Sequence, residues 1–170
     1  MCLTSRNDVA LAEASGFKIF TRDGEGLLQS VFTSTFREGL KYSPNRRIRV
    51  DPEEATFFAF EKFENAISIA REGRSRWNMV RGGLIVLPVT LFEVVATGKY
   101  HVPSDDIQCM DGYYPAFQSK EIIVHDNPET RSQFHDEVLT DWLKDKKYGM
   151  SAIEKEAFRI RVPHLAAVLK

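Results

Sequence analysis

The stretch that decides the fold runs from Ala55 to Tyr100 and reads ATFFAFEKFENAISIAREGRSRWNMVRGGLIVLPVTLFEVVATGKY. It opens with Phe57 to Phe60, whose aromatic character is typical of a short strand. From Glu61 to Arg71 the period is helical: one apolar face is formed by Phe60, Phe63, Ala66, Ile67 and Ala70, and Gly73 is placed to end the helix. From Leu84 to Ala96 the chain is apolar on both faces, which indicates an interior strand. This order of elements predicts a compact α+β core.

Further strands are predicted on both sides of this stretch. Gly16 to Arg22 alternates as a strand does, Asp23 to Gly26 is a turn signal, and Leu27 to Phe32 is the returning strand of a hairpin. Glu121 to His125 has the composition of another strand. Pro88 lacks a backbone donor, so it predicts a bulge or an edge within the long apolar strand.

The last third of the chain has a helical pattern. Asn127 and Pro128 form a helix start, and Ser151 with Glu154 matches a capping box that opens a second helix, which Pro163 interrupts. The apolar stripe of the first helix consists of Phe134, Val138, Leu139, Trp142 and Leu143. This stripe needs a surface to cover it, either the core of the same chain or a second copy.

The expected architecture follows from these patterns. Residues 1–15 are an N-terminal arm or a short helix, because their periodicity is weak. Residues 16–126 form an α+β core, with a twisted and mainly antiparallel sheet packed on one central helix. Residues 127–170 form a C-terminal helical extension packed on the core.

Composition narrows the class of protein. The chain has 170 residues and a formal net charge of −1, which fits one domain and argues against a surface built mainly for nucleic acid or anionic membrane. No apolar run is long enough to cross a bilayer. Two cysteines, Cys2 and Cys109, do not suggest a disulfide scaffold. We therefore predict a cytoplasmic protein that does not insert into a membrane.

The main candidate site is the basic loop after the central helix. Its residues are Arg71, Arg74, Arg76, Trp77 and Arg81. Guanidinium groups bind phosphate or carboxylate through paired donors, and an indole offers a face for stacking. The alternative is a solvated loop whose arginines pair with nearby acidic residues. Arginines in the polar segment from Gly39 to Val50, which turns at Ser43-Pro44-Asn45, could extend the patch: Arg46, Arg47 and Arg49.

Other kinds of site find little support in the sequence. The four histidines show no metal-ligand spacing, and neither cysteine lies in a C-x-x-C motif, so no metal site is predicted. A histidine at a strand end, such as His125, is usually a hydrogen-bonded structural residue. No nucleotide-binding glycine motif or serine-nucleophile motif is present, and no cofactor is predicted. An N-terminal thiol at Cys2, exposed by removal of Met1, is a weaker nucleophile hypothesis.

The order of motifs over residues 16–125 resembles a group of small uncharacterised domains in phage and microbial proteins. The resemblance rests on GFKIF, the Phe57–Phe60 strand, the helix F-E-x-F-E-x-A-x-x-x-A, the strand V-T-L-F-E-V-V, the segment from Asp111 to Ala116 and the strand EIIVH. The frame is also similar to small ADP-ribosyltransferase-like folds, which implies an enzyme that uses NAD.

The transferase resemblance carries over to specific positions. It implies Arg22 as the arginine on an early strand and Thr33-Ser34-Thr35 as a loose counterpart of the S-T-S motif. The acidic member would come from Glu61 and Glu64, spaced E-x-x-E, or from Glu93. The E-x-E or Q-x-E spacing of the arginine class and the H-G-T opening of the histidine class are both absent.

Three functional hypotheses remain open. The first is a non-catalytic module that binds an anionic ligand or a protein partner through the arginine-rich loop. The second is the transferase-like enzyme, which a concave pocket holding Arg22, Ser34 and a glutamate would favour. The third is an interaction protein that forms a homodimer through its C-terminal helices. Fold-back is expected for the first of these helices, and dimer contact for the final segment, residues 163–170.

Overall fold

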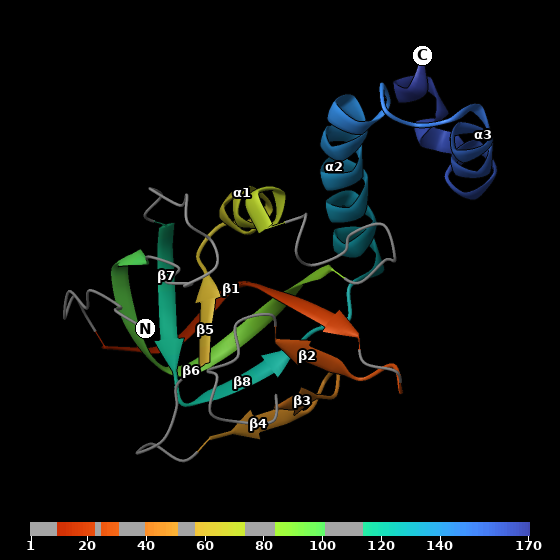
Figure 1. The fold of residues 1–170 in the computed structure, drawn as a ribbon. Helices are drawn as coiled ribbons and strands as arrows, with labels where there is room; N and C mark the ends of the chain where they lie inside the picture. Colours follow the sequence, from red (N-terminus) through yellow and green to blue (C-terminus); the bar gives the residue numbers. More distant parts are fainter. Residues whose placement is uncertain (1–9, 23–24, 31–39, 51–56, 74–83, 101–113) are drawn as a thin grey trace.

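The structure is a computed structural model that describes residues 10–22, 25–30, 40–50, 57–73, 84–100 and 114–170. Within these ranges the fold is α+β, as predicted (Figure 1). The strands are β1 (Ala10–Arg22), β2 (Leu28–Ser30), β3 (Lys41–Tyr42), β4 (Arg47–Arg49), β5 (Phe57–Phe60), β6 (Ile85–Tyr100), β7 (Tyr114–Ser119) and β8 (Glu121–Val124). The helices are α1 (Phe63–Gly73), α2 (Pro128–Lys146), α3 (Ala152–Arg161) and the 3-10 helix η2 (Pro163–Leu169).

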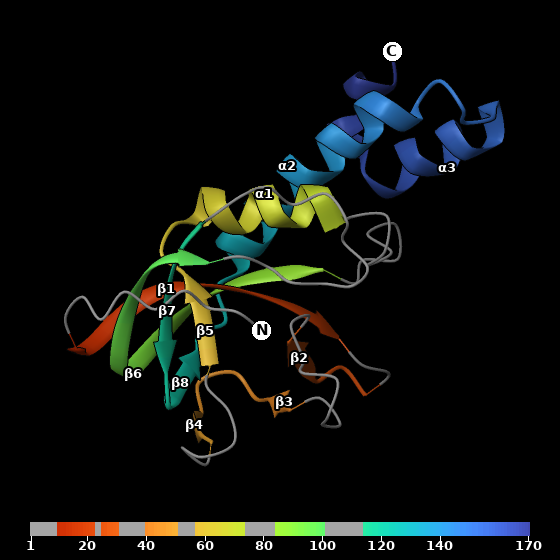
Figure 2. The ribbon, with the colours of Figure 1, turned by 60° about the vertical axis from the view of Figure 1, so that its left-hand side comes forward.

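Two long strands organise the sheet, in which all the described pairings are antiparallel. β1 and β6 pair from Phe20↔Ile85 to Ala10↔Val95. The other edge of β6 pairs first with β8 and then with β7. β5 pairs with β7 and, through Phe17↔Phe60, with β1. The strands β1, β5, β7 and β6 therefore close into a ring, and the long strands curve strongly to allow it (Figure 2).

The closest approach within this ring explains a glycine. At Gly16, a Cβ atom would lie 2.6 Å from the backbone oxygen of Phe60. Only a residue without a side chain lets β1 pass β5 at this distance. The glycine at position 16 of β1 therefore permits the ring to close.

The remaining strands extend the sheet at its two ends. β2 pairs with the end of β1, β3 pairs with β2, and β4 pairs with β8. The predicted hairpin between β1 and β2 is confirmed, and so is the turn at Pro44-Asn45, where Asn45 has a φ of 61°. The strands β3 and β4 on either side of this turn were not predicted, because each has only two or three residues.

Successive residues along the strands point to opposite faces of the sheet, where the described residues form two separate cores. Ile19 packs under the helices, whereas Phe20 packs in the cluster on the opposite face. β5 shows the same split, which is why all four of its residues are buried. The first cluster consists of strand residues together with Ala66, Ile67, Ile69, Ala70, Phe134 and Val138 of the helices. The second consists only of residues from the sheet and its short connections.

Helix α1 covers the sheet much as its pattern predicts. Ala66, Ile67 and Ala70 are buried, together with Ile69, which the predicted face did not include. Phe63 is only partly buried at the edge of this core, where its ring meets Phe17 edge-on at 5.4 Å between centroids. The helix begins at Phe63, two residues later than predicted.

Helix α2 folds back onto the core, as expected for the first C-terminal helix. The Asn127 side chain accepts a hydrogen bond from the Thr130 backbone N–H at 3.0 Å, and Pro128 occupies the first turn. Four of the predicted stripe residues are buried: Phe134, Val138, Leu139 and Leu143. The side chain of the fifth, Trp142, lies outside the described part of the chain.

The strands correct one prediction and decide between the two alternatives of another. Residues 10–15 belong to β1, so this part of the chain is not a helix or an arm. Pairing with the far half of β6 holds it in place although its small residues carry little pattern. Pro88 causes no bulge, because the register is constant across it. The Pro88 carbonyl accepts a hydrogen bond from the His125 N–H at 2.9 Å. Pro88 therefore lies at the end of the ladder between β6 and β8, and its missing N–H faces that end.

Candidate functional site

The predicted arginine loop lies almost wholly outside the described residues. Arg74, Arg76, Trp77 and Arg81 fall within residues 74–83, and only the backbone of Arg71 is described, in the last turn of α1. The two ends of the loop are described, since α1 ends at Gly73 and Leu84 precedes β6. The anion-binding loop therefore stays a prediction.

A pocket of about 510 Å³ lies where the end of β1, the start of β6, helix α2 and η2 meet. Its lining comes from segments that are far apart in sequence. The lining residues are Arg22, Leu84, Ile85, Pro128, Arg131, Ser132, His135, Asp136 and His164. Leu84 is the first described residue after the arginine loop.

Helix α2 supplies the polar wall. Arg131, Ser132, His135 and Asp136 are spaced at i, i+1, i+4 and i+5, which places them on one side of the helix. The buried Phe134 and Val138 turn the other side toward the core. The capped start of α2 fixes the helix one turn before Arg131.

Two contacts tie the pocket together. His164 of η2 lies 2.6 Å from Asp136 of α2, measured from Nε2 to Oδ1. Arg131 forms an ion pair with Asp126 at 3.1 Å through one terminal nitrogen. Its Nε is buried without a hydrogen-bond partner among the described residues. The described part of the fold thus supplies no acceptor for this buried donor.

The remaining cationic groups set the charge of the pocket. Arg22 donates to the Gly26 carbonyl at 2.9 Å through a single nitrogen, which leaves most of its donors unused in that contact. Burial lowers the pKa of His135, and nearby His164 lowers it further, whereas the Asp136 carboxylate acts in the opposite direction. His135 is therefore neutral at pH 7, and the fixed charges in the lining are two arginines and one aspartate.

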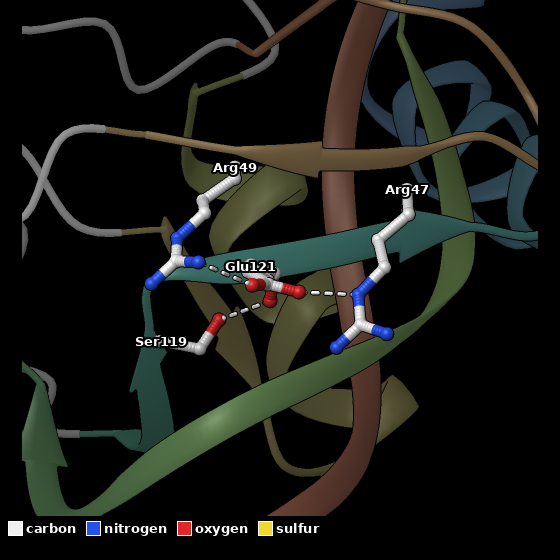
Figure 3. Close-up of polar contacts among 4 residues, drawn as sticks. All are labelled: Arg47, Arg49, Ser119 and Glu121. Atoms are coloured by element: carbon white, nitrogen blue, oxygen red, sulfur yellow. Dashed lines mark hydrogen bonds and ion pairs between the residues drawn. The ribbon is translucent and has the colours of Figure 1, made fainter.

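A second cationic cluster lies on β4, at the other side of the molecule from α2 (Figures 1 and 2). Arg47 and Arg49 both contact the carboxylate of Glu121 on β8, Arg47 through its Nε and Arg49 at 3.4 Å (Figure 3). The Arg47 guanidinium also stacks 4.0 Å from the centre of the Phe92 ring. Ser119 donates to the backbone oxygen of Glu121 at 2.7 Å.

This second cluster has a structural explanation. The Glu121 side chain is only 11% exposed, and its charge is compensated by the two arginines on the neighbouring strand. The cluster therefore fastens the short strand β4 to β8. β4 lies away from α2, and Arg47 and Arg49 are not among the residues that line the pocket.

Sequence reasoning missed most of the pocket. The spacing of Arg131, Ser132, His135 and Asp136 was a readable signal, but the helix was interpreted only through its apolar stripe. His164 gave no signal, because it meets Asp136 only after the chain reverses through α3. Of the residues implied by the transferase resemblance, Arg22 lines the pocket.

The structure also places the histidine that the sequence singled out at a strand end. His125 is hydrogen-bonded to Thr90 at 2.7 Å, as its structural interpretation expects. It follows β8 directly, and it is not among the residues that line the pocket.

Comparison with known proteins identifies no relative. No protein family, no curated protein and no solved structure matches this chain. Within the described ranges, none of the helices is long and apolar enough to span a membrane. The same residues contain no cluster of three histidine, cysteine, aspartate or glutamate side chains placed to hold a metal ion.

Proposed function

We propose that this protein is a non-catalytic module that binds an anionic ligand, a phosphate- or carboxylate-bearing molecule, in the pocket between the sheet and α2. The observation that carries the proposal is the convergence of the Arg22 and Arg131 side chains on one pocket. A bound anion would accept from the donors that the described residues leave over.

Three further features support an anion over a cation. His135 and His164 offer ring nitrogens as donors, and Ser132 offers a hydroxyl. Pro128 places the first turn of the 19-residue helix α2 in the lining, where the helix dipole favours negative charge. The single carboxylate of the described lining, Asp136, is already bonded to His164.

In this proposal the arginine loop completes the site. Leu84, three residues after Arg81 in the sequence, belongs to the pocket wall, and in this proposal Arg74, Arg76 or Arg81 contacts a ligand larger than a single phosphate. A nucleotide or another polyanion then becomes the expected ligand class, with Trp77 available for stacking.

Calorimetric titration with inorganic phosphate, pyrophosphate and ATP tests the proposal. The Arg22→Met and Arg131→Met variants should each weaken binding by about tenfold or more, the loss of a charged hydrogen bond. Arg159→Met removes an equivalent charge on α3, where Arg159 pairs with Glu156 away from the pocket, and should bind as the wild type does. No binding by the wild-type protein at low salt would refute the proposal.

The transferase-like enzyme stays the second candidate because Arg22 lines a pocket, as the resemblance implies. Glu61, Glu64 and Glu93 are not among the described lining residues, and Ser34 lies outside the described ranges. Incubation with NAD and varied acceptors tests this alternative. Release of nicotinamide that is lost in Glu64→Ala would establish it, and the absence of turnover in the wild type would exclude it.

A further inference from the structure

Helix α3 presents an apolar stripe that the described part of the fold does not cover. Ile153 is 82% exposed and Ile160 is 73% exposed, and the helix has no buried residue. Ala157 is exposed between them, so the three residues follow the i, i+4, i+7 spacing of one helix face. Both views show α3 beyond α2 and away from the sheet (Figures 1 and 2).

The face of α3 opposite this stripe already has a partner. Phe158 and Lys155 are partly buried, and among the described elements the helix packs mainly against η2. In η2, Leu169 is buried and contacts with α2 hold the segment in place. The stripe of Ile153, Ala157 and Ile160 is therefore the outer face of a helix whose inner face is occupied.

The charges beside this stripe identify what would cover it. The first half of α3 carries Glu154 and Glu156, with the partly buried Lys155 between them on the inner face, and the last turn carries Arg159 and Arg161. A helix that is acidic at one end and basic at the other is complementary to a copy of itself running in the opposite direction. The same helix placed in parallel would set like charges beside each other.

We propose that the protein forms a two-fold symmetric homodimer in which α3 pairs antiparallel with α3 of a second copy. Ala157 lies at the symmetry axis, where a small side chain allows close approach. Ile153 of each helix then packs beside Ile160 of the other. Glu154 and Arg161, each one residue past an isoleucine, flank the stripe on the same side and meet across the interface in two equivalent ion pairs.

This arrangement revises where a dimer contact was expected. The segment from Pro163 to Leu169 packs within its own chain, and the free surface lies on the preceding helix. One short helix per copy makes a small interface, so the dimer should be weak and depend on protein concentration.

Sedimentation equilibrium over a wide concentration range tests the proposal. The wild-type protein should change from monomer to dimer, and the variant carrying Ile153→Glu and Ile160→Glu should stay monomeric. Tyr148→Ser removes another exposed apolar side chain, 84% exposed and outside the stripe, and should leave the dimer intact. A wild-type monomer at every concentration would overturn the proposal, and so would a dimer that survives both glutamate substitutions.

Charge reversal tests the antiparallel arrangement itself. Arg161→Glu sets a carboxylate opposite Glu154 of the second copy, and the repulsion should weaken the dimer by about tenfold. Adding Glu154→Lys to that variant restores both pairs and should recover the wild-type association. Far-UV circular dichroism checks that α3 stays helical when its capping glutamate is replaced. A double variant that associates no better than Arg161→Glu, with its helix intact, would overturn the pairing.

Discussion

The ammonium nitrogen of Lys18 lies 3.0 Å from the backbone oxygen of Phe58, inside the protein and across two strands that have begun to separate. β1 and β5 pair at Phe17↔Phe60, and beyond that point the Lys18 side chain supplies the donor that a backbone N–H would otherwise supply. The ammonium also lies 4.1 Å from the centre of the Phe58 ring. Lys18 is 2% exposed, and this burial lowers its pKa from 10.5 to about 7.

Lys18→Met should therefore change the pH dependence of stability. The unfolded chain holds the Lys18 proton up to about pH 10.5 and the folded chain only up to about 7, so the stability of the wild type rises with pH between these values. The loss of folding stability caused by burying the charged Lys18 side chain is fully present below pH 7 and is at most about 5 kcal/mol. Urea unfolding should show the variant more stable than the wild type at pH 6.5, and the difference should be smaller or reversed at pH 10, where the variant still lacks the Lys18–Phe58 hydrogen bond. A difference independent of pH would contradict this account.

Glu121→Gln should destabilise the protein by about 1–3 kcal/mol, because Arg47 and Arg49 lose their shared carboxylate while the side chain stays largely buried. Most of each arginine is exposed, which keeps the expected loss below that of a fully buried pair. Glu25→Gln is the matched control. Its pair with Lys41 is 3.3 Å long but exposed on both sides, so the expected change is about 0.5 kcal/mol or less. Chemical unfolding measures the stability of both variants. Equal losses of stability would contradict the structural role of Glu121.

Phe134→Ala should separate α2 from the core. The Phe134 ring is fully buried, so its removal should cost about 3–5 kcal/mol. Phe63→Ala removes the same side chain at the edge of the same cluster, where the ring is only partly buried, and should cost about half as much. Thermal unfolding gives the two values. A larger effect at Phe63 than at Phe134 would mean that α1, and not α2, closes this core.

The pocket should bind anions more tightly as pH falls from 8 to 6. Burial keeps His135 neutral in the free protein, and the groups that face it are Asp136 and His164. A bound anion favours protonation of the His135 imidazole, and linkage requires that this protonation favours the anion equally. Sulfate is the suitable titrant, because its own charge is constant in this range. The affinity of His135→Gln should vary less with pH, whereas His125→Gln, outside the pocket, should retain the wild-type profile.

The strands with strong local patterns could be predicted, and those that depend on tertiary partners could not. Phe57 to Phe60 and Leu84 to Ala96 are apolar on both faces because two cores meet on the sheet, and that pattern is local. Residues 10–15 lack it, since small and polar residues pair there with a strand far along the chain. β3 and β4 exist only because β2 and β8 offer them edges.

Part of the candidate site could likewise be predicted from the sequence, and part could not. Charge clustering along the chain identified the arginine loop, since four arginines surround one tryptophan between Arg71 and Arg81. The pocket brings together Arg22, Leu84, Arg131 and His164, which no sequence window contains. Only the folded path of the chain places the guanidinium groups of β1 and α2 around one space.

The long pairing of β1 with β6 also determines when this fold can form. The partners are 65 residues apart at Phe20 and Ile85 and 85 residues apart at Ala10 and Val95. During synthesis β1 leaves the ribosome before its main partner exists, and at ordinary elongation rates the wait is about 3–17 s. The hairpin with β2 is its only nearby described pairing during that time. Closure of the ring is therefore a late and non-local event, and folding should be slow, on the millisecond-to-second scale of proteins dominated by distant strand pairs.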